Sequence, residues 1–201
     1  MYKFLGKDKA MKTLIFFASP NRNGNTYKLV EKFIQGIGKE SVDMINVYNK
    51  KILPCVDCKY CYNEEKCAIK DDMTEIYEKI NRSDVIVIAS PMYFSSVTAP
   101  MKALIDRLQV YWSKKYIRKD RSNIKDKRAV LICTAGSYWD DMFLPLEAVL
   151  NHGFAAMDAK NMEKIYAVNT DKIPVEKNEK ILKEAYELGV KLRQEFEHKY
   201  E

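Results

Sequence analysis

Short apolar segments alternate along this chain with segments whose apolar residues recur at helical spacing, and this alternation restricts the possible folds most. Four apolar segments end in turn residues and predict buried strands at residues 13–18, 42–48, 84–90 and 128–134. A weaker fifth strand is expected at residues 164–168. The segments between and after the strands predict helices at residues 29–37, 73–80, 101–108, 142–151 and 175–198.

Strands that alternate with helices indicate a parallel sheet covered on both faces, and right-handed crossovers leave few topologies open. We therefore expect an α/β fold, a flavodoxin-like three-layer sandwich around a five-stranded parallel sheet of strand order 2-1-3-4-5. No repeat or linker divides the 201 residues, so residues 1–201 are expected to form a single domain. Within it, residues 1–10 are expected to be a loose leader and residues 49–71 a cysteine-rich insertion loop.

The composition argues against several other classes of protein. Hydrophobic residues make up 47% of the chain and charged residues 31%, as in ordinary globular proteins and unlike disordered or collagen-like chains. The longest wholly apolar runs have five residues, whereas a membrane-spanning helix needs about 20. No secretory signal is visible at the N-terminus, so we expect a cytoplasmic protein without a membrane partner.

The net charge of +6 is a weak indication of nucleic-acid binding. Basic residues are denser between residues 114 and 128, where aromatic side chains accompany them. A nucleic-acid patch and a solvated loop between buried elements both explain this stretch, and the solvated loop is the more common case. We therefore expect no nucleic-acid partner.

Polar side chains follow the first predicted strand: Ser19, Asn21, Asn23, Asn25 and Thr26. Their hydroxyls, amides and backbone N–H groups precede a helix whose N-terminal dipole favours an anion. The segment matches neither the Walker motif nor the dinucleotide fingerprint. It therefore predicts either a mononucleotide phosphate site or an ordinary capped turn.

Large rings and small hydroxyls follow the third predicted strand: Pro91, Met92, Tyr93, Phe94 and Ser95. Taken alone, such a run is more often core than cofactor site. Strands one and three are neighbours in the expected sheet, however, so this loop and the phosphate loop would meet at one edge. A flat ring system such as a flavin could pack against these side chains.

Four of the five cysteines, Cys55, Cys58, Cys61 and Cys67, have the spacing C-x2-C-x2-C-x5-C, and Cys133 stands apart within a predicted strand. Two-residue gaps let successive thiolates converge on one metal centre. Three interpretations stay open: a [4Fe–4S] cluster, which the spacing favours, structural zinc, and no metal. Cys133 is expected to be a small buried hydrophobe.

Four motifs together resemble the iron–sulfur flavoproteins within the NAD(P)H-dependent FMN reductase group, over roughly residues 12–168. In chain order they are Ser19-Pro-Asn-Arg-Asn-Gly-Asn-Thr26, Pro54-Cys-Val-Asp-Cys-Lys-Tyr-Cys61 with Cys67 and Asp71-Asp-Met73, Ser90-Pro-Met-Tyr-Phe94, and Ala99-Pro-Met-Lys-Ala-Leu-Ile-Asp-Arg107. The resemblance implies a flavodoxin-like fold, bound FMN and, in cysteine-complete members, a [4Fe–4S] cluster next to the flavin. It also implies a homodimer or a larger assembly such as a tetramer.

The resemblance also assigns site residues by position. Ser19, Asn23, Asn25 and Thr26 would hold the FMN phosphate, and Pro91 to Ser95 with Gly136 would line the ring. Where relatives often carry arginine this chain has Asn21, and its basic residue, Arg22, comes one position later. The metal ligands would be Cys55, Cys58, Cys61 and Cys67.

Two functions from different classes follow. The first is an FMN-dependent oxidoreductase that passes electrons from NAD(P)H or a ferredoxin-like protein donor to an acceptor, through a [4Fe–4S] cluster. A cluster-free FMN or quinone reductase is the alternative within this class. The second is a non-enzymatic electron carrier, suggested by the lack of a recognisable nicotinamide-binding motif. No separate catalytic residues are expected, because the flavin carries the chemistry.

Overall fold

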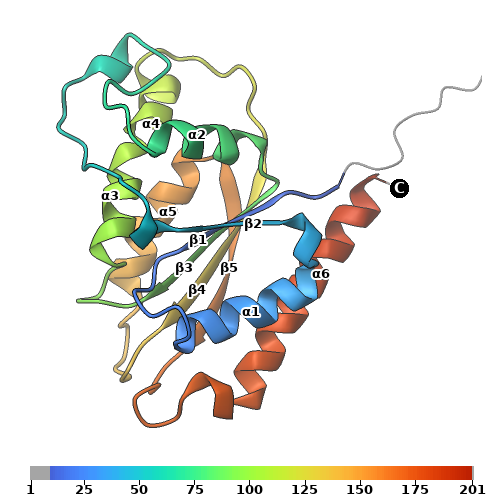
Figure 1. Cartoon of the computed structure of the whole chain (residues 1–201). Coiled ribbons are helices and arrows are strands. Elements are labelled where there is room, and N and C mark those ends of the chain that lie inside the picture. The colour runs from blue at the N-terminus through green and yellow to red at the C-terminus, as the bar shows by residue number, and fades with distance from the viewer. Residues whose placement is uncertain (1–9, 201) are drawn as a thin grey trace, which may run out of the picture.

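A five-stranded parallel sheet forms the centre of the computed structural model, which describes residues 10–200 (Figure 1). The strands are β1 (Thr13–Phe17), β2 (Val42–Asn46), β3 (Val85–Pro91), β4 (Lys127–Thr134) and β5 (Ala159–Ala167). Their order in the sheet is β2-β1-β3-β4-β5, and every neighbouring pair is parallel. The predicted fold class and strand order are confirmed. The expected leader, residues 1–10, lies outside the described residues except for Ala10.

Helices cover both faces of the sheet. They are α1 (Asn25–Ile37), α2 (Met73–Arg82), α3 (Ala99–Arg107), α4 (Gln109–Tyr116), α5 (Leu144–Ala156) and α6 (Glu179–Tyr200). Short 3-10 turns lie at η1 (Lys39–Ser41), η2 (Val47–Asn49), η3 (Tyr60–Tyr62) and η4 (Val175–Lys177). In Figure 1, α1 and α6 lie side by side on one face, and α3, α4 and α5 lie on the other. Among residues 10–199, no helix combines the length and apolar character needed to cross a bilayer.

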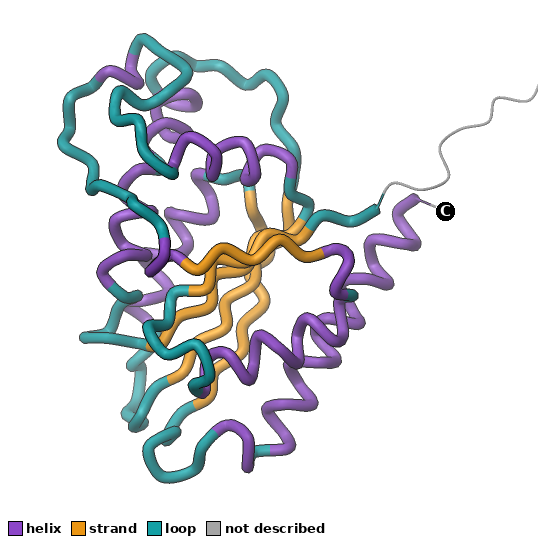
Figure 2. Tube along the Cα trace, viewed as in Figure 1, coloured by secondary structure: helices purple, strands orange, loops and turns teal. Residues whose placement is uncertain are grey.

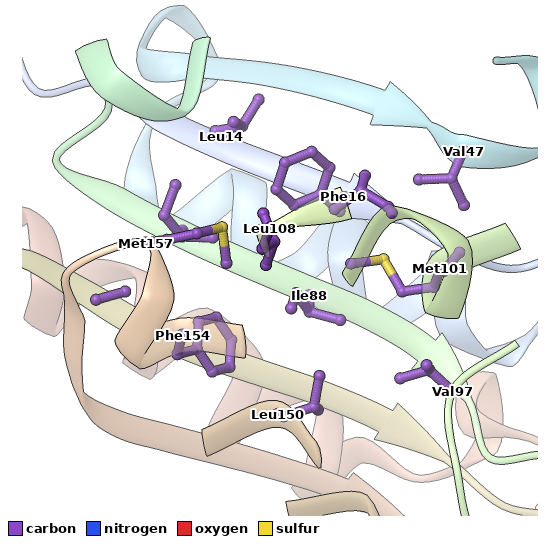
Figure 3. Close-up of a cluster of buried hydrophobic side chains, with 14 of the residues drawn as sticks. Leu14, Phe16, Val47, Ile88, Val97, Met101, Leu108, Leu150, Phe154 and Met157 are labelled. Carbon is purple, nitrogen blue, oxygen red and sulfur yellow. The ribbon is translucent and has the colours of Figure 1, made fainter. Parts of the chain in front are cut away.

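The two-sided burial explains why the central strands β1, β3 and β4 are mostly apolar. Successive side chains of β1 point to opposite faces, so Leu14 and Phe16 join one core cluster while Ile15 and Phe17 join the other. Figure 3 shows the first cluster, in which Phe16 and Ile88 of the sheet lie near Met101 of α3. Cys133 is fully buried in this cluster, as expected, and burial raises the pKa of its thiol to about 12.

The basic stretch between residues 114 and 128 differs from the expected solvated loop, because helix α4 occupies its first part. Lys115 and Lys127 are only 8% and 5% exposed. The Lys115 amine donates hydrogen bonds to the carbonyls of Ala155 and Ala156, and the Lys127 amine donates to those of Lys125 and Met157. These lysines are part of the interior because backbone carbonyls replace the water that would otherwise solvate the ammonium groups.

The buried Lys127 predicts a pH dependence of stability. Burial lowers the pKa of its amine from 10.5 to about 8. The unfolded chain therefore binds this proton more tightly, and the free energy of unfolding should rise as the pH increases from about 8 to about 10.5. Relative to Lys127→Met, the wild type should gain about 3 kcal/mol across that window. Urea unfolding of both proteins below and above the window measures this gain, and parallel pH profiles would contradict it.

Candidate functional site

The loops that follow β1, β3 and β4 meet at the carboxyl edge of the sheet, where Figure 2 shows loops gathered at one end of the strands. Hydrogen bonds join these loops to one another. Thr98 Oγ1 donates to the carbonyl of Ala18 at 3.0 Å, and the Met92 N–H donates to the carbonyl of Thr134 at 2.8 Å. The loops after β1, β3 and β4 therefore form one continuous surface at the edge where parallel sheets bind ligands.

The loop after β1 ends in a helix N-terminus that no side chain caps. Ser19 is buried, and its hydroxyl accepts a hydrogen bond from the Asn21 N–H at 3.2 Å. The Asn21 side-chain oxygen accepts from the Asn23 N–H at 3.0 Å. No acidic residue lies in the first turn of α1. The first N–H groups of α1 have no partner within the helix, so this turn favours an anion.

Three of the predicted cofactor-binding residues in this loop have partners in other elements of the structure. The Thr26 hydroxyl lies 2.8 Å from that of Thr134 at the end of β4. The Asn25 side-chain oxygen accepts from the Val175 N–H at 2.9 Å. Arg22 donates to the side-chain oxygen of Asn49 at 2.7 Å, so its guanidinium reaches towards η2. These contacts fix the shape of the loop from β4, η4 and η2. Asn23 is exposed beside them.

The loop after β3 forms a tight turn with two residues in the left-handed region. Tyr93 and Ser96 exchange both backbone hydrogen bonds, at 2.9 and 3.0 Å. Phe94 and Ser95 between them have φ values of 48° and 56°. Residues other than glycine rarely adopt these φ values, and backbone strain of this kind is often found at functional sites. The turn leaves the Phe94 ring wholly exposed, so an apolar ring faces solvent in the loop after β3.

The loop after β4 is held against the loop after β5. The N–H groups of Thr170 and Asp171 donate to the carbonyls of Ala135 and Gly136 at 3.0 and 3.3 Å. A Cβ atom on Gly136 would lie 2.3 Å from Oδ2 of Asp171, so only glycine fits there without moving that carboxylate. Sequence reasoning missed Asp171, because it lies 35 residues after Gly136 and belongs to no recognised motif. The hydrogen bond between Thr134 and Thr26 also joins residues that no local pattern pairs.

The cysteine-rich loop lies apart from that edge. It arcs away from the sheet between η2 and α2, with only the short turn η3 in it (Figure 2). Cys55, Cys58, Cys61 and Cys67 all line one cavity of about 30 Å³ together with residues of α3 and α4. Their thiols are free, and nowhere in residues 10–199 do three His, Cys, Asp or Glu side chains converge as a metal site.

Helix α3 separates this cavity from the strained turn. Arg107, the last residue of α3, lines the cavity, whereas the first residue, Ala99, follows the turn after β3. Nine helical residues span about 13 Å. Within one chain, the end of α3 that lines the cysteine cavity and the end that follows the turn after β3 are therefore about 13 Å apart.

Comparison with known proteins gives one matching family. Residues 11–172 match the family described as "NADPH-dependent FMN reductase". An "Iron-sulfur flavoprotein" of Archaeoglobus fulgidus is 31% identical over 194 residues, which cover 94% of this chain and 82% of the relative. Another from Methanocaldococcus jannaschii is 38% identical, but the match covers only 48% of this chain and 51% of that protein.

Solved structures share the fold at low sequence identity. The "NAD(P)H:quinone oxidoreductase from Methanothermobacter marburgensis" superposes with a TM-score of 0.73 at 22% identity, covering 91% of this chain and 96% of that one. An "FMN-dependent NADH-azoreductase" of Bacillus anthracis, solved in complex with FMN, has a TM-score of 0.62 at 16% identity, covering 90% of this chain and 99% of that one.

Proposed function

Because the chain belongs to the NADPH-dependent FMN reductase family, and is thus an NAD(P)H-dependent flavin oxidoreductase, we propose that its FMN lies across the three loops at the carboxyl edge. The observation that carries this placement is the first turn of α1, which has neither a side-chain cap nor an acid. That turn follows β1, the chain reverses its order in the sheet between β1 and β3, and the Thr26 hydroxyl lies 2.8 Å from that of Thr134 at the end of β4. The residues present fit a mononucleotide with one phosphate and one flat ring.

In this proposal each loop has a distinct role. The phosphate accepts hydrogen bonds from the first turn of α1 and from the side chains of the first loop, among which Asn23 is exposed. The ring lies against the turn at residues 91–95 and against the backbone at Gly136, where the missing side chain leaves room for the carboxylate of Asp171. Bound FMN would supply electron transfer from a nicotinamide to an acceptor, and the protein would supply position and exclusion of water.

The identity of the electron donor is tested by mixing the FMN-loaded protein anaerobically with NADH, with NADPH and with a reduced ferredoxin. We expect a nicotinamide to bleach the flavin absorbance within the time of a turnover. Reduction by ferredoxin alone would contradict the nicotinamide as donor and favour the electron carrier.

We also propose that the cysteine loop holds a [4Fe–4S] cluster, which would act as a one-electron relay. Two observations support it: the four thiols line one cavity, and four cysteines are a complete ligand set for such a cluster. Anaerobically purified protein is then expected to contain about four iron atoms and four acid-labile sulfides per chain. Stoichiometric zinc, or no metal, would contradict this.

We further propose that the protein is a homo-oligomer. Large apolar side chains are exposed near the carboxyl edge, among them Phe94, Trp139, Leu144 and Ile173. Exposed apolar groups of this size are common where subunits meet. Light scattering of the FMN-loaded protein should give a multiple of the 23.5 kDa chain mass, and a monomer mass would overturn the proposal.

A further inference from the structure

A buried ion pair lies at the base of the cysteine loop. Arg107 at the end of α3 and Asp71 before α2 meet through two parallel hydrogen bonds, Nη1 to Oδ2 at 2.7 Å and Nη2 to Oδ1 at 3.2 Å. Their side chains are 0% and 2% exposed. Burial alone would raise the pKa of Asp71, but hydrogen bonds from Arg107, Leu53 and Met73 hold that pKa below its usual value. Both groups are therefore charged.

The same pair fastens both ends of the loop. Arg107 Nη1 donates to the carbonyl of Leu53 at 2.8 Å, and Nη2 donates to the carbonyl of Ile69 at 3.1 Å. Asp71 accepts in return from the Leu53 N–H at 2.9 Å and the Met73 N–H at 3.0 Å. Leu53 lies two residues before Cys55, and Ile69 lies two residues after Cys67. The guanidinium of Arg107 thus joins the two chain segments that enter and leave the four-cysteine segment.

Little else sets the shape of the first half of this segment. Residues 53–60 are all exposed, and no helix or strand includes residues 51–59. Asp57 and Lys59 have φ values of 48° and 58°, which side chains disfavour. At the tip, Arg118 donates to the carbonyls of Cys61 and Glu64. The Cys61 thiol lies 3.3 Å from the Ser113 hydroxyl of α4. The loop is therefore held at its neck and at its tip by side chains of α3, α4 and the segment after α4.

We propose that Arg107 and Asp71 are positioning residues that close the neck of the cysteine loop and keep its four thiols gathered at one cavity for the group they bind. The proposal rests on the proposed function only for the identity of that group. A lysine cannot replace the arginine, because its single ammonium cannot present two parallel donors to a carboxylate while it bridges two carbonyls. A buried pair of this kind is weak evidence for stability and better explained by the geometry it specifies.

The test uses the full chain without metal and three variants. Arg107→Lys keeps the charge and loses the fork, Asp71→Asn keeps the size and loses the charge, and the exposed Arg82→Lys, whose Glu78 partner is also on α2, is the matched control. The first readout is hydrogen exchange at the amides of Leu53 and Met73, and the second is alkylation of each cysteine, followed by mass spectrometry. The buried Cys133 reports global unfolding within the same sample.

In Arg107→Lys and Asp71→Asn we expect hydrogen exchange at the amides of Leu53 and Met73 to become about 10- to 100-fold faster. This factor corresponds to the stabilisation lost when a hydrogen bond to a charged group is removed. Cys61 and Cys67, which are half-buried, should alkylate faster, while Cys133 stays protected and Arg82→Lys behaves as wild type. After anaerobic reconstitution, the two neck variants should retain less than about half of the wild-type iron, because four-cysteine sites need all their ligands in place.

Unchanged exchange and alkylation in both neck variants would overturn the proposal. If a single substitution exposes Cys133 as well, the double variant Arg107→Met/Asp71→Leu is measured instead, because it removes both buried charges together. A loosened neck with Cys133 protected supports the proposal there too, and global exposure of Cys133 in every neck variant overturns it. A wild type without iron would refute the cluster alone, since the exchange and alkylation results need no metal.

Discussion

Asn23→Asp is expected to weaken FMN binding by at least about 100-fold and to change riboflavin binding by less than about threefold. Aspartate and asparagine have the same shape, and the Asn23 N–H bond to Asn21 remains. A carboxylate about 5 Å from a phosphate is repelled by about 3 kcal/mol per unit charge at the effective dielectric of a protein surface. Riboflavin has no phosphate, so this repulsion is absent.

The same substitution should not destabilise the protein without ligand. An acid just ahead of a helix interacts favourably with the helix dipole, by about 0.3–1 kcal/mol. Flavin fluorescence quenching gives both dissociation constants, and thermal unfolding of the apoprotein gives the stability. Asn161→Asp, on the exposed side of β5, adds the same charge elsewhere and should leave FMN binding unchanged. Equal losses for FMN and riboflavin would contradict a phosphate at this loop.

Gly36→Ala is expected to destabilise the protein by about 2–3 kcal/mol, near the upper end for overpacking. Gly36 lies in α1 where the helix crosses α6, and a Cβ there would lie 2.1 Å from the backbone oxygen of Tyr186. A Cβ on Gly189 of α6 would likewise lie only 2.4 Å from the backbone oxygen of Phe33. Backbone atoms cannot rotate away as side chains do, so the two helices must separate.

The matched control is Gly153→Ala in α5. There the nearest atoms to a Cβ would be side-chain carbons at 3.7 Å or more, which is ordinary contact. Alanine is the better helix former, so this variant should gain about 0.5–1 kcal/mol. Urea unfolding of both variants measures the difference. If both substitutions changed the free energy of unfolding in the same direction, close packing of α1 on α6 would not explain the effect of Gly36→Ala.

The centre of the sheet was predictable because β1, β3 and β4 are buried on both faces and therefore carry mostly apolar residues. The edge strand β5 was predicted at residues 164–168 but spans Ala159–Ala167. Its first half contains Lys160, Asn161 and Glu163, which are polar residues of the kind that suit an edge strand and which interrupt the apolar pattern. Helix α4 was missed for a related reason. Its buried Lys115 occupies an interior position that a periodicity argument assigns to an apolar residue.

The loops of the candidate site were also predictable, because turn residues directly follow strands whose ends share one edge. Their long-range partners were not. Thr134, Val175 and Asp171 lie more than 30 residues from the segments they hold, and local patterns carry no information about such pairs. The cysteine spacing predicted thiolates that converge on one metal centre, but it carried no information about the cavity that Arg107 and α4 line with them.

The most direct test of the account is a titration of the apoprotein with FMN, followed by the quenching of flavin fluorescence. We predict saturation at one FMN per chain, with tighter binding of FMN than of riboflavin in the wild type and loss of that preference in Asn23→Asp. Absence of saturable FMN binding, or equal affinity of the wild type for FMN and riboflavin, would contradict a phosphate-binding loop between β1 and α1.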